Sequence, residues 1–352
     1  SNTTAEKTSA KNLLISYMQL GFPIASAKMK KKQMSWGVSF GLKPVTLVNY
    51  RIESSDRLPG IDSLRTYYEG TGGLSQANIS TGFKIKNFSV GVSSGYTFGV
   101  KNYSTRLDFV NDTVIYYKSN TLSRTNYDGV FLTLGALYEK VTKEKGIIRI
   151  GAFSNLEKSV NAKTVSANTT IGYDGSGGII TIDTVNVVPN QRGKVILPAT
   201  YGVGFTYSSK NLLYGADFET TNWNAYSFYG GKDSVTNSYT LRVGVQFYPA
   251  KDNTPVSKYW SYVKYRAGAY FGNENVKLNN ETRLSYGITC GAGFPLTSLQ
   301  RLSYYGDVVI MNIGLELGVR GNKQSVSLRE SINRFNIGIS MNAKWFNKVK
   351  YD

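Results

Sequence analysis

Residues 34–42 have the sequence M-S-W-G-V-S-F-G-L, in which two kinds of residue alternate strictly. The even positions are large and apolar, and the odd positions are serine or glycine. Alternation with a period of two predicts a β-strand with two unlike faces. In a soluble β-sandwich the second face would carry solvated polar groups, so a face of serine and glycine needs another explanation.

The same alternation recurs along the whole chain. Clear copies lie at 88–100, 239–247, 282–294 and 309–320, and weaker or shorter copies at 13–20, 74–85, 127–138, 147–158, 199–207, 212–221, 262–271 and 334–346. With 34–52 as one long strand, the sequence predicts thirteen strands and no helix of consequence. Evenly spaced strands separated by turn signals predict an antiparallel meander, and thirteen strands exceed what an open twisted sheet usually holds.

The connections between these strands also alternate in length. Those after odd-numbered strands are short, as at 26–33 and 86–87, whereas those after even-numbered strands are longer and polar, as at 53–73, 101–126 and 159–198. Short turns on one side and long loops on the other are typical of bacterial outer-membrane barrels. The sequence therefore predicts an all-β transmembrane barrel over residues 1–352, as a single domain in the bacterial outer membrane.

Thirteen is an odd number, and bacterial single-chain barrels close with an even one. The first predicted strand enters a short turn, so an upward strand is expected before it. We therefore expect about 14 strands, one of them N-terminal and either missing or hidden in residues 1–10, with both termini in the periplasm.

In a membrane barrel the apolar face meets lipid and the other face lines the lumen. Charged residues that share the second face are candidates for lining the lumen, and those we select are Asp217, Glu219, Arg242, Lys264, Arg266, Arg283, Glu316 and Arg320. Glycines on that face are candidates for a close approach by another segment: Gly37, Gly41, Gly91, Gly95 and Gly99. In the alternative soluble sandwich, the same charged residues would form the solvated face.

Four segments resemble a known family. Residues 335–352, F-N-I-G-I-S-M-N-A-K-W-F-N-K-V-K-Y-D, are similar to the C-terminal end of uncharacterised Bacteroidetes outer-membrane barrels. Three earlier segments, Y-M-Q-L-G-F-P-I, W-G-V-S-F-G-L-K-P-V and Y-Y-E-G-T-G-G-L-S-Q-A-N, resemble the first half of that family. Such proteins distantly resemble the FadL fatty-acid transporters, which implies fourteen strands and an N-terminal hatch. The N-terminal portion that would contain a hatch does not match, and the resemblance assigns no functional residue.

Four functions follow from these observations. The first is a channel or transporter for small or hydrophobic molecules, since rings of Arg or Lys in a lumen favour anions. The alternative to that role for the arginines is a structural network with Asp217, Glu219 and Glu316. The second function is a partner-binding accessory subunit of a multi-protein outer-membrane complex for secretion or barrel assembly, with other outer-membrane or periplasmic subunits as partners.

The third function, an enzyme, is disfavoured because the chain has no histidine, the commonest general base and metal ligand. We expect no catalytic residues, metal or cofactor, although Asp217 and Glu219 share a face. The fourth, nucleic-acid binding, is suggested only by the net charge of +18, and the basic residues form no compact recognition stripe. We expect the charge to attract outer-membrane lipids and lipopolysaccharide instead.

Overall fold

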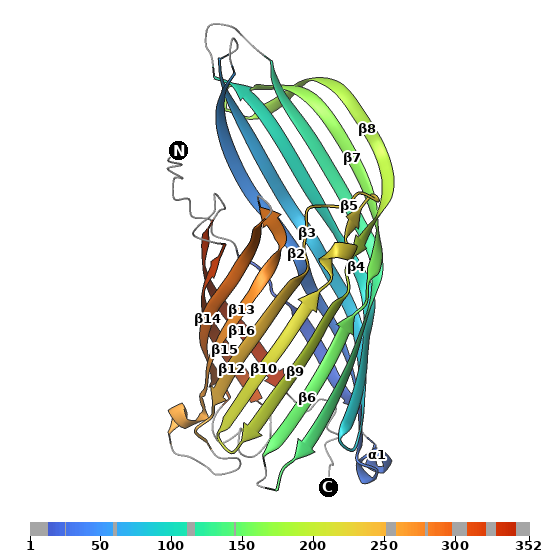
Figure 1. Cartoon of the computed structure of the whole chain (residues 1–352), viewed down its shortest axis with the longest axis vertical. Coiled ribbons are helices and arrows are strands. Elements are labelled where there is room, and N and C mark those ends of the chain that lie inside the picture. Colours follow the sequence, from blue (N-terminus) through green and yellow to red (C-terminus); the bar gives the residue numbers. More distant parts are fainter. Residues whose placement is uncertain are drawn as a thin grey trace, which may run out of the picture.

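A computed structural model describes residues 13–24, 26–58, 62–110, 117–143, 146–250, 258–278, 281–297, 308–321 and 329–342 of the chain. These residues form one large antiparallel sheet (Figure 1). Thirteen of its strands are hydrogen-bonded in a continuous path, in the order β1-β2-β3-β4-β5-β6-β9-β10-β12-β13-β14-β15-β16. The predicted all-β antiparallel meander is confirmed. Within the described residues β1 and β16 are not paired, so the sheet is not closed by that path.

Each of the thirteen strands of this path overlaps a strand predicted from the sequence, although the first does so at only a few residues. Their bounds are β1 Met18–Ile24, β2 Met34–Leu58, β3 Asp62–Ile85, β4 Phe88–Phe109, β5 Lys118–Val141, β6 Ile147–Asn155, β9 Thr200–Ser209, β10 Leu212–Thr221, β12 Ser238–Phe247, β13 Lys264–Leu278, β14 Glu281–Pro295, β15 Val308–Arg320 and β16 Glu330–Asn342. The helices are one turn long: α1 Ala27–Lys31, η1 Trp223–Ala225 and η2 Tyr259–Tyr262. No helix within the described ranges is long and apolar enough to cross a membrane.

The prediction of long loops was wrong at 53–73, 101–126 and 159–198. Strands β2, β3, β4 and β5 continue through the first two of these segments and reach lengths of 22 to 25 residues, against 9 residues for β6. The third segment forms the antiparallel pair β7 Lys158–Tyr173 and β8 Ile179–Leu197, and β7 pairs with the far half of β5. We call these continued strands, with β7, β8 and β11 Ser227–Phe228, the distal extension (Figure 1).

The distal extension was missed because its strands lack the strict alternation of large apolar and small residues that marks the others. In β7, for example, small and polar residues occupy both faces. A strand that lies beyond the lipid does not need an apolar outer face, and its hydrogen bonds to neighbouring strands hold it in place. Composition alone therefore made these strands look like loops.

The predicted first strand was partly wrong as well. Residues 13–17 precede the strand without regular structure, and pairing with β2 begins at Met18, opposite Leu42. Pairing then continues to Ile24, opposite Trp36. The chain reverses through α1, at the end of the molecule opposite the distal extension (Figure 1).

The large apolar side chains of the repeated pattern point outward and are exposed. Phe40, Val92, Val203 and Ile337 are 46%, 43%, 57% and 64% exposed, respectively. In a soluble sandwich such residues would form the core. Their exposure on the outside of a curved sheet fits a surface that meets lipid.

The buried apolar core lies instead in the distal extension. Leu74, Tyr127, Val160, Ala162 and Val195 pack together there. The connection after β10 folds against them, because Tyr226 and Tyr229 pack on this cluster and β11 pairs with β8. The Tyr229 hydroxyl lies 3.0 Å from the carbonyl oxygens of both Ala162 and Gln191, which fixes this connection in place.

Candidate lumen site

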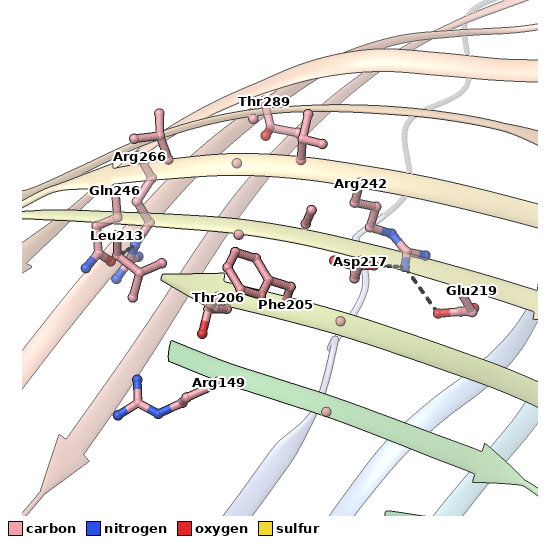
Figure 2. A pocket seen from close by; sticks show the side chains of 18 of the residues that line it. Arg149, Phe205, Thr206, Leu213, Asp217, Glu219, Arg242, Gln246, Arg266 and Thr289 are labelled. Atoms are coloured by element: carbon pink, nitrogen blue, oxygen red, sulfur yellow. Dashed lines mark hydrogen bonds and ion pairs between the residues drawn. The ribbon is translucent and has the colours of Figure 1, made fainter. Parts of the chain in front are cut away.

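The inner faces of the shorter strands enclose a cavity of about 1330 Å³ (Figure 2). Side chains from β5, β6, β9, β10, β12, β13, β14, β15 and β16 line it. They include five charged residues: Arg149, Asp217, Glu219, Arg242 and Arg266. Four of these were predicted to line the lumen, and the fifth, Arg149, shares the inner-face alternation of its strand.

Glycine forms much of the wall of this cavity. Gly91 is paired with Gly135 across neighbouring strands, and both line the cavity. A second row runs from Gly215 through Gly244 to Gly268. Without side chains at these positions the backbone itself is the wall, which widens the lumen at this level.

The five glycine candidates differ in how closely their neighbours approach. A Cβ on Gly95 or Gly99 would overlap backbone atoms of β3, and one on Gly41 would lie 2.8 Å from Asn78 Oδ1 and 3.2 Å from the Met18 carbonyl oxygen. At Gly37 and Gly91 the nearest atoms lie at ordinary contact distances of 3.7 and 3.5 Å. All of these neighbours belong to adjacent strands of the same sheet.

Arg242 joins two carboxylates on the inner face. Its Nη1 lies 2.9 Å from Asp217 Oδ1 and 3.2 Å from Glu219 Oε2 (Figure 2). Strand register explains the first contact, since Asp217 on β10 stands directly opposite Arg242 on β12. The predicted structural network exists at this position.

Arg266 is held by neutral groups. Its Nε donates to Gln246 Oε1 at 2.8 Å and its Nη1 donates to Asn312 Oδ1 at 2.8 Å. Within the described residues it makes no ion pair. Arg149, by contrast, is paired at 2.7 Å with Glu139, which also binds Lys84 at 2.7 Å.

The other predicted lumen residues do not line this cavity. Arg283 and Arg320 lie near the distal ends of β14 and β15, where both contact Glu274 and Glu330. Lys264, at the start of β13, lies over the Tyr248 ring at 5.4 Å. These contacts place the three cations above and below the cavity. Lys344, which shares the same alternation in the last predicted strand, falls outside the described residues.

Glu316 has a different partner from the one expected. It accepts a hydrogen bond from Tyr270 at 3.1 Å and pairs with Arg334 at 2.7 Å. Arg334, Glu274 and Glu330 were missed by the sequence analysis, although the first two share the inner-face alternation of their strands. The predicted strands there began or ended too close to these positions.

One part of the lining was not expected. Ser16 and Tyr17, which precede β1, contribute to the cavity wall. A smaller cavity of about 260 Å³ lies beside the same segment, between β1 and β2. The chain itself thus supplies a non-strand segment within the lumen.

The site offers little for catalysis or metal binding. Among the described residues no three or more His, Cys, Asp or Glu side chains gather in a way that could hold a metal ion. The two neighbouring carboxylates, Asp217 and Glu219, both contact Arg242. The cavity wall is mostly apolar and rich in glycine, with the charge of Arg242 compensated by two carboxylates and with Arg266 as a cation held by amide oxygens.

Comparison with known proteins gives one matching family and solved structures with a similar fold. A family model described as BamG matches residues 1–352. The Ralstonia pickettii toluene transporter TbuX is similar in structure at 12% identity and a TM-score of 0.50, over 91% of this chain and 79% of that one. A Pseudomonas aeruginosa FadL homologue is similar at 15% identity and a TM-score of 0.51, over 91% of this chain and 75% of that one. No curated protein sequence matches. At these identities the structural likeness shows the fold, which is that of FadL-like outer-membrane barrels and confirms the predicted fold class.

Proposed function

The chain belongs to the BamG family, and from that premise we propose that it is a non-enzymatic, partner-binding subunit of a multi-protein complex in the bacterial outer membrane. The whole chain acts as a single barrel domain, with the α1 end toward the periplasm. The family name fits the barrel-assembly alternative expected from the sequence. The FadL-like fold and the exposed outward apolar face support the membrane location.

The observation that carries this proposal is the open edge of the distal extension. Strand β8 pairs with β7 along its length, but on its other side, within the part of the chain that the structure describes, it pairs only with β11, at Val195 and Ile196. An edge strand presents unpaired backbone N–H and C=O groups, which form a template for another strand. Partner proteins commonly bind by adding a strand to such an edge.

The side chains of this edge are also apolar and exposed. Ile182, Val185 and Val187 are 53%, 70% and 47% exposed. They lie beyond the level of β6, where the outer surface of the barrel no longer follows its lipid-facing pattern. Exposed apolar surface outside the lipid is typical of a protein-binding site.

Most charges of the lumen are paired, which argues against an ion-selective channel. Arg242 is neutralised by two carboxylates, and Arg283 and Arg320 contact Glu274 and Glu330. A wall compensated in this way lacks the single-sign ring that selects permeating ions. The charges of the lumen therefore support the structure of the barrel more than conduction through it.

The test is purification of the full chain from native outer membranes in mild detergent. We expect other outer-membrane subunits to copurify in stoichiometric amounts. Val185→Lys with Val187→Lys, which places charge on the open edge, should release them. The control pair, Ser119→Lys with Thr121→Lys, lies on β5 between two paired neighbours and should retain them. A wild-type protein that purifies alone would contradict the proposal.

A second candidate is the passage of small hydrophobic molecules. It is favoured by the cavity, whose wall combines glycine with side chains such as Leu137 and Leu213. It is also favoured by the likeness to a barrel described as a toluene transporter. The purified barrel should then bind hydrophobic probes in the lumen, and deletion should impair uptake of such compounds. Absence of both effects would exclude this candidate.

A further inference from the structure

Four basic side chains gather on the outward face of the distal extension. They are Arg124 on β5, Lys163 on β7, and Arg192 and Lys194 on β8, and all four are exposed. Within the described residues none of them makes an ion pair. We call this set the basic outer patch.

Strand register places these residues together and on the outside. Thr125 and Thr164 are opposite each other, buried and hydrogen-bonded at 2.9 Å, so they face inward. Their neighbours in the alternating pattern, Arg124 and Lys163, therefore face outward. Lys163 stands directly opposite Arg192. Like charges directly opposite each other in a sheet repel, and a bound anion would remove that cost.

The basic outer patch lies directly beyond the lipid-facing apolar surface. On β5 the continuous run of outward apolar side chains ends at Val130, which is opposite Tyr96 on β4, and of the outward positions beyond it only Leu122 is apolar. Two residues further along, Asp128 accepts a hydrogen bond from Asn161 at 2.9 Å. The patch begins in this row, since Lys194 is opposite Asn161. An aromatic residue at the end of an apolar face marks the membrane–water interface.

The acidic side chains near the patch do not balance it. Asp128 borders it and is engaged by Asn161, and Glu157 lies before the start of β7, two rows nearer the apolar surface. The balance in this area is thus four positive charges against two negative ones, at the depth where lipid headgroups lie.

We propose that the basic outer patch binds the phosphate groups of phosphorylated glycolipids in the outer leaflet. Guanidinium groups match phosphate oxygens geometrically, and lysines add point charges. Basic residues next to a membrane surface attract anionic headgroups. The inference uses the proposed membrane location, but it is independent of protein partners.

The experiment measures binding by the full chain in uncharged detergent micelles, by titration calorimetry. The probes are a disaccharide lipid carrying two phosphates, the same lipid with its phosphates removed, and inorganic phosphate. The wild type should bind the phosphorylated lipid at least about tenfold more tightly than the dephosphorylated one, and less tightly as salt rises. Inorganic phosphate at millimolar concentration should compete poorly.

Two charge-matched variants locate the site. Lys163→Gln, Arg192→Gln and Lys194→Gln together should weaken binding of the phosphorylated lipid by about tenfold or more. Lys28→Gln, Lys31→Gln and Lys32→Gln remove the same charge at the opposite end of the barrel and should change binding less than twofold. Heat-modifiable gel mobility verifies that both variants fold.

Three results would overturn the proposal. They are equal affinity of the wild type for both lipids, unchanged affinity in the patch variant, and complete competition by inorganic phosphate, which would indicate a site for free anions. The comparison of the two lipids and the competition by phosphate use the wild type alone, so they do not depend on whether a variant folds. Loss of copurifying subunits would concern the proposed function alone, so the two failures are distinguishable.

Discussion

At the scale of single residues, Lys158 is a buried cation without a carboxylate partner among the described residues. It is 8% exposed and lies over the Phe131 ring at 5.3 Å. Burial, and then the charge of Lys43, lowers the pKa of Lys158 to about 8. A lysine in an unfolded chain has a pKa of about 10.4, so the unfolded state binds more protons between these values and stability rises with pH through that window.

Lys158→Met should therefore stabilise the protein at pH 7, by up to about 3 kcal/mol. The gain should shrink as pH rises from 8 toward 10.5, because the wild-type lysine loses its charge. The measurement is the midpoint of thermal unfolding by heat-modifiable gel mobility at pH 7 and pH 10. Lys163→Met, on the exposed face of the same strand, serves as the control and should not show this change with pH. An equal gain at both pH values would assign the effect to packing.

Arg242 offers a second test at this scale. Because its side chain is 44% exposed, the ion pair with Asp217 should contribute only about 0.2–1 kcal/mol. A double-mutant cycle of Arg242→Gln and Asp217→Asn should give a coupling of that size, and salt should reduce it. The matched cycle of Arg266→Gln and Asp217→Asn should give no coupling, since Arg266 binds Gln246 and Asn312 instead of Asp217. Equal coupling in both cycles would show a general charge effect.

At the scale of elements, the strand pattern was predictable wherever lipid acts on it. Strands such as β4 and β14 alternate large and small residues because one face meets lipid and the other the lumen. In the distal extension that constraint is absent: small and polar residues occupy both faces of β7, and the apolar residues of β8 do not alternate regularly, so neither strand showed the pattern. The position of β1 was also missed, because pairing with β2 decides where it begins.

Gly72 is the position in β3 where the backbone requires glycine. Its φ is +108°, and a Cβ there would overlap the Val100 carbonyl oxygen of β4. Gly72→Ala should lower the free energy of unfolding by more than about 1 kcal/mol, because alanine disfavours this φ and the neighbouring strand must move. Gly175→Ala, in the turn between β7 and β8, is the control, since nothing lies within 4 Å of its Cβ. Thermal midpoints of the two variants should differ, and equal midpoints would contradict a structural role for Gly72.

At the scale of the whole molecule, alternation alone identified four of the charged residues that line the cavity but not how they pair. Asp217, Glu219, Arg242 and Arg266 were predicted to face inward, and they line the cavity. The ion pairs of the inner face depend on the register between neighbouring strands, as where Glu316 on β15 stands opposite Arg334 on β16. A single strand does not encode that register, so the expected network had the right residues and some wrong pairs.

The direction of the strands determines how the barrel closes. Along a path of thirteen antiparallel strands, the first and last run the same way, so β1 and β16 could pair directly only in parallel. We propose that one additional strand running the other way lies between them, which makes fourteen and keeps every pair antiparallel. The centres of β1 and β16 would then lie about 10 Å apart, twice the spacing of neighbouring strands.

Cysteine cross-linking tests this arrangement. In a Cys290→Ser background, Leu20→Cys is combined in turn with Phe335→Cys, Ile337→Cys and Ile339→Cys, all at exposed outward positions. We expect no disulfide from any pair, because a disulfide needs Cα atoms within about 7 Å, whereas a bifunctional maleimide that spans about 10 Å should join at least one pair. Leu20→Cys with Phe40→Cys, on strands paired at these residues, is the positive control for disulfide formation. A disulfide between β1 and β16 would show that they pair directly, and the proposed additional strand would then be wrong.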